Sequence, residues 1–136
     1  MPRSPESPAS DEPVDLVVCL PFASFHDWWD EGGTPEFPDD YEYDWVVGRK
    51  PPTRITPHGS RLYVVCGGLL RGFAPILRVD PWDAKRWALV RDGRSAEAVT
   101  INETIRSFRG WRYRWWSRRD EMPFTDWAWE AVPPRP

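Results

Sequence analysis

Apolar and polar residues follow one another along this chain in short runs that predict β-strands over most of its length. Residues 14–20, with the sequence VDLVVCL, form an apolar, β-branched run that ends at Pro21, as expected for a strand buried on both faces. Residues 45–47 form a second short apolar run, which predicts another strand. The clearest pattern spans 61–79, where two apolar runs flank the dipeptide Gly67-Gly68 and predict a tight hairpin.

The second half of the chain continues this pattern. Gly72 and Pro75 interrupt the second run of the first hairpin, which indicates a bulge, a bend or a sheet edge there. Residues 81–86 are expected to be helical. The runs that follow, 87–91 and 95–101, flank Asp92-Gly93 and predict a second hairpin.

Residues 108–116 alternate aromatic and cationic side chains with the period of a strand. Trp111, Tyr113 and Trp115 fall on one face, and Arg112 and Arg114 on the other. We expect this strand to lie half in the core and half at the surface.

Helical signals are few. Ser24 is a suitable N-cap for a short helix over 25–31, which ends at Gly32-Gly33. Six or seven short strands, one or two short helices and hairpin connections predict an α+β, mainly β domain. The architecture that fits is a small mixed β-barrel with a helix closing one end.

The length of 136 residues suits one domain with one hydrophobic core. Residues 1–13 combine proline, serine and acidic side chains and predict a disordered tail. Residues 14–131 form the single predicted domain, and residues 132–136 a C-terminal tail.

Tryptophan and arginine are the unusual components. Ten Trp exceed what a small core uses, so we expect some of them to line a groove or an interface. Residues 1–50 carry 3 basic and 12 acidic side chains, whereas residues 51–136 carry 15 basic and 9 acidic ones. Nearly all of the positive charge is arginine, which grips phosphate or carboxylate and stacks on planar groups. A genome rich in arginine codons is the alternative explanation for the preference for arginine over lysine.

Several classes of protein are not indicated. The longest apolar runs fall far short of a membrane span of about 18 residues, and the N-terminal segment lacks the apolar stretch of a signal peptide, so a cytoplasmic protein is expected. Cys19 and Cys66 have no CxxC spacing, and His26 and His58 are too few for a metal site. We expect no metal and no cofactor. Signatures of a hydrolase triad or of a phosphate-binding loop are also missing.

The segment GRKPPTR at 48–54, followed by the RLYVVC strand and its Gly-rich hairpin partner, resembles the PUA-like superfamily and within it the ASCH and EVE-type domains. The ASCH signature reads G-x-K-x-x-E-x-R. Gly48 and Lys50 match it, whereas Thr53 stands where the signature has Glu, and Arg54 comes one position early. The resemblance covers the order of elements over residues 14–116.

This resemblance implies a β-barrel whose cleft receives RNA or a modified base. Some ASCH proteins hydrolyse an acylated cytidine with a Lys, a Thr and a Glu. Lys50 and Thr53 would take the first two roles, with Glu103 or Glu97 in the third.

The residues themselves point to an anionic, planar ligand. Arg49, Lys50 and Arg54 form a local cationic cluster, and the arginines of 106–119 are interleaved with aromatic rings, the combination that single-stranded nucleic acid requires. The same arginines could instead pack on the rings or pair with the acidic first part of the chain. The expected ligand contacts are Trp45, Arg49, Arg54, Tyr63, Trp111, Arg112, Tyr113, Arg114 and Trp115.

Three hypotheses follow. The first is a protein that binds RNA, single-stranded DNA or a modified nucleotide. Non-specific binding to duplex is disfavoured by the net charge of −3. The second is an amidohydrolase-type enzyme acting on an N-acylated nucleoside. The third is a protein-interaction module, for example of a phage or defence system, that binds a protein partner or a second copy through surface Trp.

Overall fold

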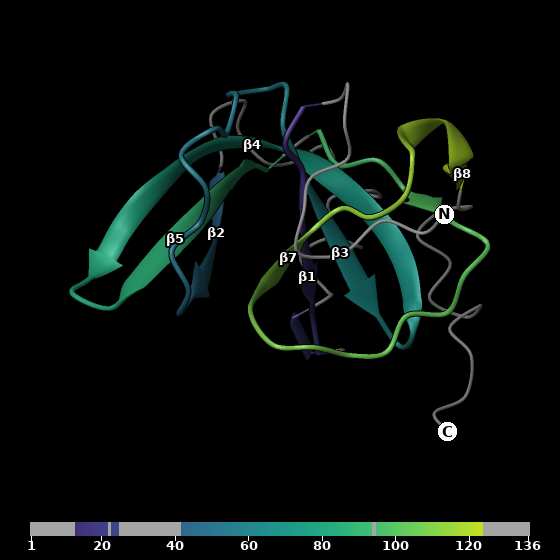
Figure 1. The fold of residues 1–136 in the computed structure, drawn as a ribbon, viewed down its shortest axis with the longest axis horizontal. Helices are drawn as coiled ribbons and strands as arrows, with labels where there is room; N and C mark the ends of the chain where they lie inside the picture. Colours follow the sequence, from purple (N-terminus) through teal and green to yellow (C-terminus); the bar gives the residue numbers. More distant parts are fainter. Residues whose placement is uncertain (1–12, 22, 25–41, 94, 124–136) are drawn as a thin grey trace.

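The computed structural model describes residues 13–21, 23–24, 42–93 and 95–123, which fold around one strongly curved sheet (Figure 1). The elements in chain order are β1 (Leu16–Cys19), β2 (Glu42–Val47), β3 (Arg61–Cys66), β4 (Leu69–Asp83), β5 (Arg86–Asp92), β6 (Val99–Thr100), β7 (Trp111–Tyr113), the 3-10 helix η1 (Arg118–Asp120) and β8 (Met122–Pro123). The prediction of a mainly β protein is confirmed.

Six strands form the main sheet in the order β2-β5-β4-β3-β1-β7, and β6 pairs with β8 in a small second sheet. β1 runs parallel to β3, with Leu16 opposite Leu62, and the other strand pairs are antiparallel. As predicted, β1 is buried on both faces, because Leu16 and Val18 pack in one hydrophobic cluster and Val17 packs in another on the opposite face. The predicted hairpin at Gly67-Gly68 joins β3 and β4, and both glycines have positive φ, which a side chain would disfavour.

β4 is 15 residues long, and its two ladders contain three irregularities, two of which lie where the strand bends. The ladder with β3 passes from Val64–Gly72 to Val65–Leu70, so Arg71 is an extra residue, which confirms the predicted bulge. The ladder with β5 skips Leu77 in the same way. Bulges increase local bending and twist, so the first half of β4 pairs with β3 and the second half turns to pair with β5 (Figure 1).

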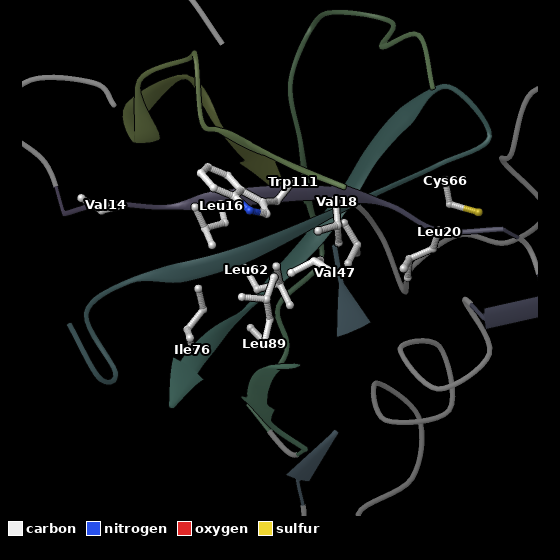
Figure 2. Close-up of a cluster of buried hydrophobic side chains, with 12 residues drawn as sticks. Val14, Leu16, Val18, Leu20, Val47, Leu62, Cys66, Ile76, Leu89 and Trp111 are labelled. Carbon is white, nitrogen blue, oxygen red and sulfur yellow. The ribbon is translucent and has the colours of Figure 1, made fainter. Parts of the chain in front are cut away.

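The curved sheet has a hydrophobic cluster on each face. The concave cluster joins both halves of the sheet, with Leu16, Val18 and Leu62 facing Leu89 and Val47 (Figure 2). The second cluster lies on the outer face of β1, β3 and the first half of β4. Side chains of the segment 97–123 complete it, among them Ile101, Ile105 and Trp116.

The strand ladder does not close into the predicted barrel, because β2 and β7 are both edges of the described sheet. A side-chain clamp links them instead. The Arg49 guanidinium donates to the Trp111 carbonyl oxygen at 2.7 Å and lies 3.7 Å from the Trp111 ring, while the Trp111 indole donates to the Arg49 carbonyl oxygen at 2.9 Å. β7 ends at Tyr113, and the side chain of the next residue, Arg114, donates to the buried Asp15 carboxylate.

Three local predictions were wrong. Residues 81–86 are not helical but form the end of β4 and the turn into β5, whose partners are β4 and β2. Asp92-Gly93 therefore makes no hairpin, and Val99–Thr100 pairs with β8. The strand predicted over 108–116 is limited to Trp111–Tyr113. Residues 81–86 belong to a local hairpin, whereas the pairing of β5 with β2 and of β6 with β8 joins segments that are distant in the sequence.

Some predictions fall outside the described residues. They include the helix over 25–31, the tail at 132–136 and all but the last residue of the tail at 1–13. Ala23 and Ser24 are helical.

In the described ranges, no helix has the length and apolar character needed to cross a membrane.

A buried ion cluster ties the start of β1 to the C-terminal part of the fold. Asp15 accepts from the Arg114 Nε at 2.7 Å, from the Arg118 guanidinium at 2.8 and 2.9 Å, and from the Arg61 backbone N–H at 2.7 Å. The side chains of Asp15 and Arg114 are 0% and 1% exposed. Such a cluster holds these segments together only while every charge keeps its partner.

Asp15→Asn should therefore lower the free energy of unfolding by about 3–5 kcal/mol, because it leaves two arginine side chains without their shared carboxylate. Urea titration followed by tryptophan fluorescence measures this change. Asp120→Asn, at an exposed position, is the matched control and should change stability little. Equal stabilities of the two variants would show that the cluster does not hold the fold.

Trp111→Phe tests the clamp between the two sheet edges. Loss of the indole donor to the Arg49 carbonyl should cost about 1 kcal/mol of unfolding free energy and speed amide hydrogen exchange in β7. The control is Trp115→Phe, which removes an indole donor to Glu103 at a more exposed contact. Unchanged exchange in β7 would show that the clamp does not hold this edge.

Candidate functional site

The inward side chains of β5 lead into two hollows. Trp87, Leu89 and Arg91 alternate toward the concave face, opposite Val47, Trp45 and Tyr43 of β2. Residues directly opposite on neighbouring strands share a face. Leu89 belongs to the core, so Trp87 and Arg91 lie toward the two ends of the concave interior.

The hollow at the Trp87 end is a groove of about 450 Å³, which we call the Lys50 groove. It lies between the loop that joins β2 to β3 and the strands β4 and β5. The described residues that line it are Lys50, Pro51, Pro52, Thr53, Ile55, Pro57, Leu77, Arg78, Val79, Pro81 and Trp87. Its floor is anchored, because Ile55, Val79 and Trp87 pack against the concave core.

The loop 48–60 is fixed at both ends. At its start, Arg49 belongs to the clamp with Trp111. At its end, the Ser60 N–H donates to the Thr56 carbonyl at 2.8 Å, and the Thr56 N–H donates to the Ser60 hydroxyl at 3.0 Å. The His58 N–H donates to the Ile76 carbonyl and the Ile76 N–H donates to the Ser60 carbonyl, which ties this turn to β4. The stretch between the two anchors therefore has a defined position.

The groove is cationic at its rim. The loop 48–60 contains Arg49, Lys50 and Arg54 and no acidic residue. Lys50 and Arg54 are exposed, and neither forms an ion pair within the described part of the chain. Among the described lining residues none is acidic. The groove thus offers positive charge beside an apolar, aromatic wall.

Arg78 also lines the groove but is already paired. Its guanidinium contacts Glu42 at 2.8 Å and Asp80 at 2.9 Å. The hydrogen bonds from Arg78 lower the pKa of the Glu42 carboxyl, and those to both carboxylates raise the pKa of Arg78. Of the two described lining cations, Lys50 is therefore the one better placed to meet an anionic ligand.

The second hollow, the Arg91 cavity, has a volume of about 260 Å³. Its described lining consists of Val18, Leu20, Ala23, Ser24, Tyr43, Asp44, Trp45, Leu62, Val64, Leu89 and Arg91. Arg91 is 2% exposed, and its guanidinium lies 4.5 Å from the Tyr43 ring. This cavity combines a buried cation, two aromatic rings and an aliphatic floor.

Three of the predicted ligand contacts lie in the interior. Tyr63 is fully buried; its hydroxyl donates to Glu121 at 2.5 Å and accepts from Arg61 at 3.1 Å. Burial, assisted by the Glu121 carboxylate, raises the pKa of Tyr63. Trp111 belongs to the concave core, and Arg114 to the Asp15 cluster. These side chains hold the fold together and do not face a ligand.

The aromatic and cationic residues of 108–116 are divided between the two faces of the sheet. Tyr113 packs against the concave core beside Trp111, at a ring separation of 5.1 Å. Arg112 lies 4.3 Å from the Phe108 ring, and Trp115 packs against the outer cluster. The alternation predicted for this segment ends at Tyr113, so it does not line one cleft.

Of the predicted catalytic residues, the structure brings together Lys50 and Thr53 in the Lys50 groove. Glu103 lies elsewhere: it accepts from the Trp115 indole at 3.0 Å, next to the bridge between Leu69 and Thr104. Leu69 and the groove residue Leu77 are separated by about 25 Å of extended chain. Glu97 pairs with Phe73 and does not line the groove either.

The remaining predicted contacts are distributed between the two hollows. Arg49 and Arg54 flank Lys50 on its loop, and Trp45 lines the Arg91 cavity. Sequence reasoning missed Trp87, Tyr43 and Arg91. The alternation of Trp87, Leu89 and Arg91 was the available signal, but it indicates a strand and not which hollow the strand faces.

The described residues do not form a surface rich in Trp. Trp111 and Trp116 are buried, Trp45, Trp87 and Trp115 are half-buried, and Trp82 is 52% exposed. A partner surface built from several Trp therefore does not appear in the described ranges.

Metal and thiol chemistry have no support in the described residues. No group of three or more His, Cys, Asp or Glu is placed to hold a metal ion there. Burial raises the pKa of the Cys19 thiol, which lowers the fraction of reactive thiolate at neutral pH.

Comparisons with known protein families, with curated proteins and with solved structures found no match.

Proposed function

We propose that the protein binds a nucleotide, as a free or modified nucleotide or as part of RNA or single-stranded DNA, in the Lys50 groove. The observation that carries the proposal is the presence of Trp87 and Lys50 in one groove without a described acidic lining residue. A base would stack on the Trp87 ring, and its phosphate would meet Lys50 and Arg54. Stacking and phosphate contact are the two components of single-strand recognition.

The size of the groove suits such a ligand. A volume of about 450 Å³ falls within the range of about 300–1,000 Å³ found for small-molecule sites. The lining is mostly apolar with few polar groups, as expected where a flat ring enters and a charged group stays at the rim. The Arg91 cavity is smaller and encloses its cation, so it fits a phosphate less well.

The resemblance to PUA-like domains supports the same class of ligand. Its implied barrel cleft receives RNA or a modified base, and in this proposal the Lys50 groove takes the place of that cleft. Membership of that superfamily, in an open form of the barrel, is part of the proposal, as is a cytoplasmic location. The net charge of −3 favours a local site for one strand over a broad duplex-binding surface.

Lys50→Ala should weaken binding of cytidine monophosphate about tenfold, because a hydrogen bond to a charged group contributes about 1.5 kcal/mol or more. Isothermal titration calorimetry at fixed ionic strength measures the affinities. Lys85→Ala is the matched control, since Lys85 is the other lysine of the chain and is also exposed. Absence of binding by the parent protein, or equal loss in both variants, would contradict this assignment.

Hydrolysis of an N-acylated nucleoside is the second candidate, favoured by the shared position of Lys50 and Thr53 in the groove. If it is correct, incubation with N-acetylcytidine releases cytidine and acetate, and Lys50→Ala abolishes the release. Chromatography of the reaction mixture detects both products. Because no described carboxylate lines the groove, we expect the protein to bind the nucleoside without hydrolysing it. Product formation by the parent protein would make hydrolysis the leading candidate function.

A further inference from the structure

Trp82 is an exposed aromatic side chain at the tip of the β4–β5 hairpin. It is 52% exposed, and among the described large hydrophobic residues Met122 is the other exposed one. A single exposed apolar side chain needs no explanation by itself. The position of Trp82 beside the Lys50 groove distinguishes it.

The backbone at Trp82 is irregular. The β4–β5 ladder pairs Pro81 with Trp87 and then Asp83 with Arg86, so Trp82 is an extra residue without a partner in the ladder. Such bulges re-aim a side chain relative to a regular strand. Both members of the preceding pair, Pro81 and Trp87, line the Lys50 groove. Trp82 therefore follows directly after the groove wall.

The hairpin tip holds its shape through local contacts. Asp83 accepts from the Arg86 guanidinium at 2.6 Å and from the Lys85 backbone N–H at 2.9 Å. These hydrogen bonds lower the pKa of the Asp83 carboxyl, so the Arg86 charge is balanced at neutral pH. Lys85, in the same turn, is exposed.

We propose that the groove and the hairpin tip together take a single-stranded nucleic acid of at least two nucleotides. One base stacks on Trp87 in the groove, and the adjacent base stacks on Trp82. This inference rests on the proposed function, because it extends the same site by one nucleotide. A nucleic acid is the occupant that fits, since the described groove lining includes Lys50 and no acidic residue, and every base presents a flat face to an indole ring.

The test compares a mononucleotide with a tetranucleotide. Calorimetric titrations at one salt concentration would use cytidine monophosphate and single-stranded tetracytidylate. The parent protein should bind the tetranucleotide about 5- to 150-fold more tightly, the range expected for one further stacked base. Trp82→Ala should remove this gain and leave the mononucleotide affinity unchanged.

Two further variants separate stacking from other causes. Trp82→Phe keeps a flat ring and should recover part of the gain, whereas a gain from the additional phosphates alone would be the same in Trp82→Ala and Trp82→Phe. Met122→Ala removes the other exposed hydrophobic side chain and should behave like the parent protein.

The two proposals fail in different ways. If neither ligand binds the parent protein, the proposed function is wrong and this inference fails with it. If the mononucleotide binds but the tetranucleotide binds no more tightly, or if Trp82→Ala keeps the full gain, the second stacking position is wrong and the proposed function stands.

Discussion

The bend of β4 is the constraint on which the remaining structure depends. Because Arg71 and Leu77 are extra residues in its two ladders, one long strand pairs with β3 along its first half and with β5 along its second. The two halves of the sheet then face each other across one hydrophobic cluster. The same bend leaves a hollow toward each end of that cluster, so the core and both hollows share one cause.

Side-chain contacts link parts of the fold that the strand ladders do not join. The clamp of Arg49 and Trp111 joins the two sheet edges, and the Asp15 cluster ties β1 to the segment after β7. Both contacts use arginines that, in the sequence, are equally suited to bind a ligand. Arg114 is buried and paired with the Asp15 carboxylate, and Arg49 reaches the Trp111 carbonyl, whereas Lys50 and Arg54 form no ion pair in the described ranges.

The aromatic residues are divided by the same principle. Trp111, Trp116 and Tyr63 lie in the two clusters, with their polar atoms satisfied by a carbonyl or by Glu121. Trp87 presents part of its ring to the Lys50 groove, and Trp82 is exposed at the hairpin tip. The proposed site thus uses tryptophans that the core does not fully enclose.

The sequence by itself determined the local features: the buried strand at 14–20, the hairpin at Gly67-Gly68, the bulge near Gly72 and the cationic loop that carries Lys50 and Thr53. Each depends on neighbouring residues, whose periodicity and turn chemistry are visible in the chain. Only the tertiary structure decided that Trp87 lines the groove, that Glu103 lies elsewhere, that Arg114 is buried and that the sheet stays open. These outcomes depend on which strands pair across long separations in sequence, and a local pattern of apolar and polar residues does not encode the partner.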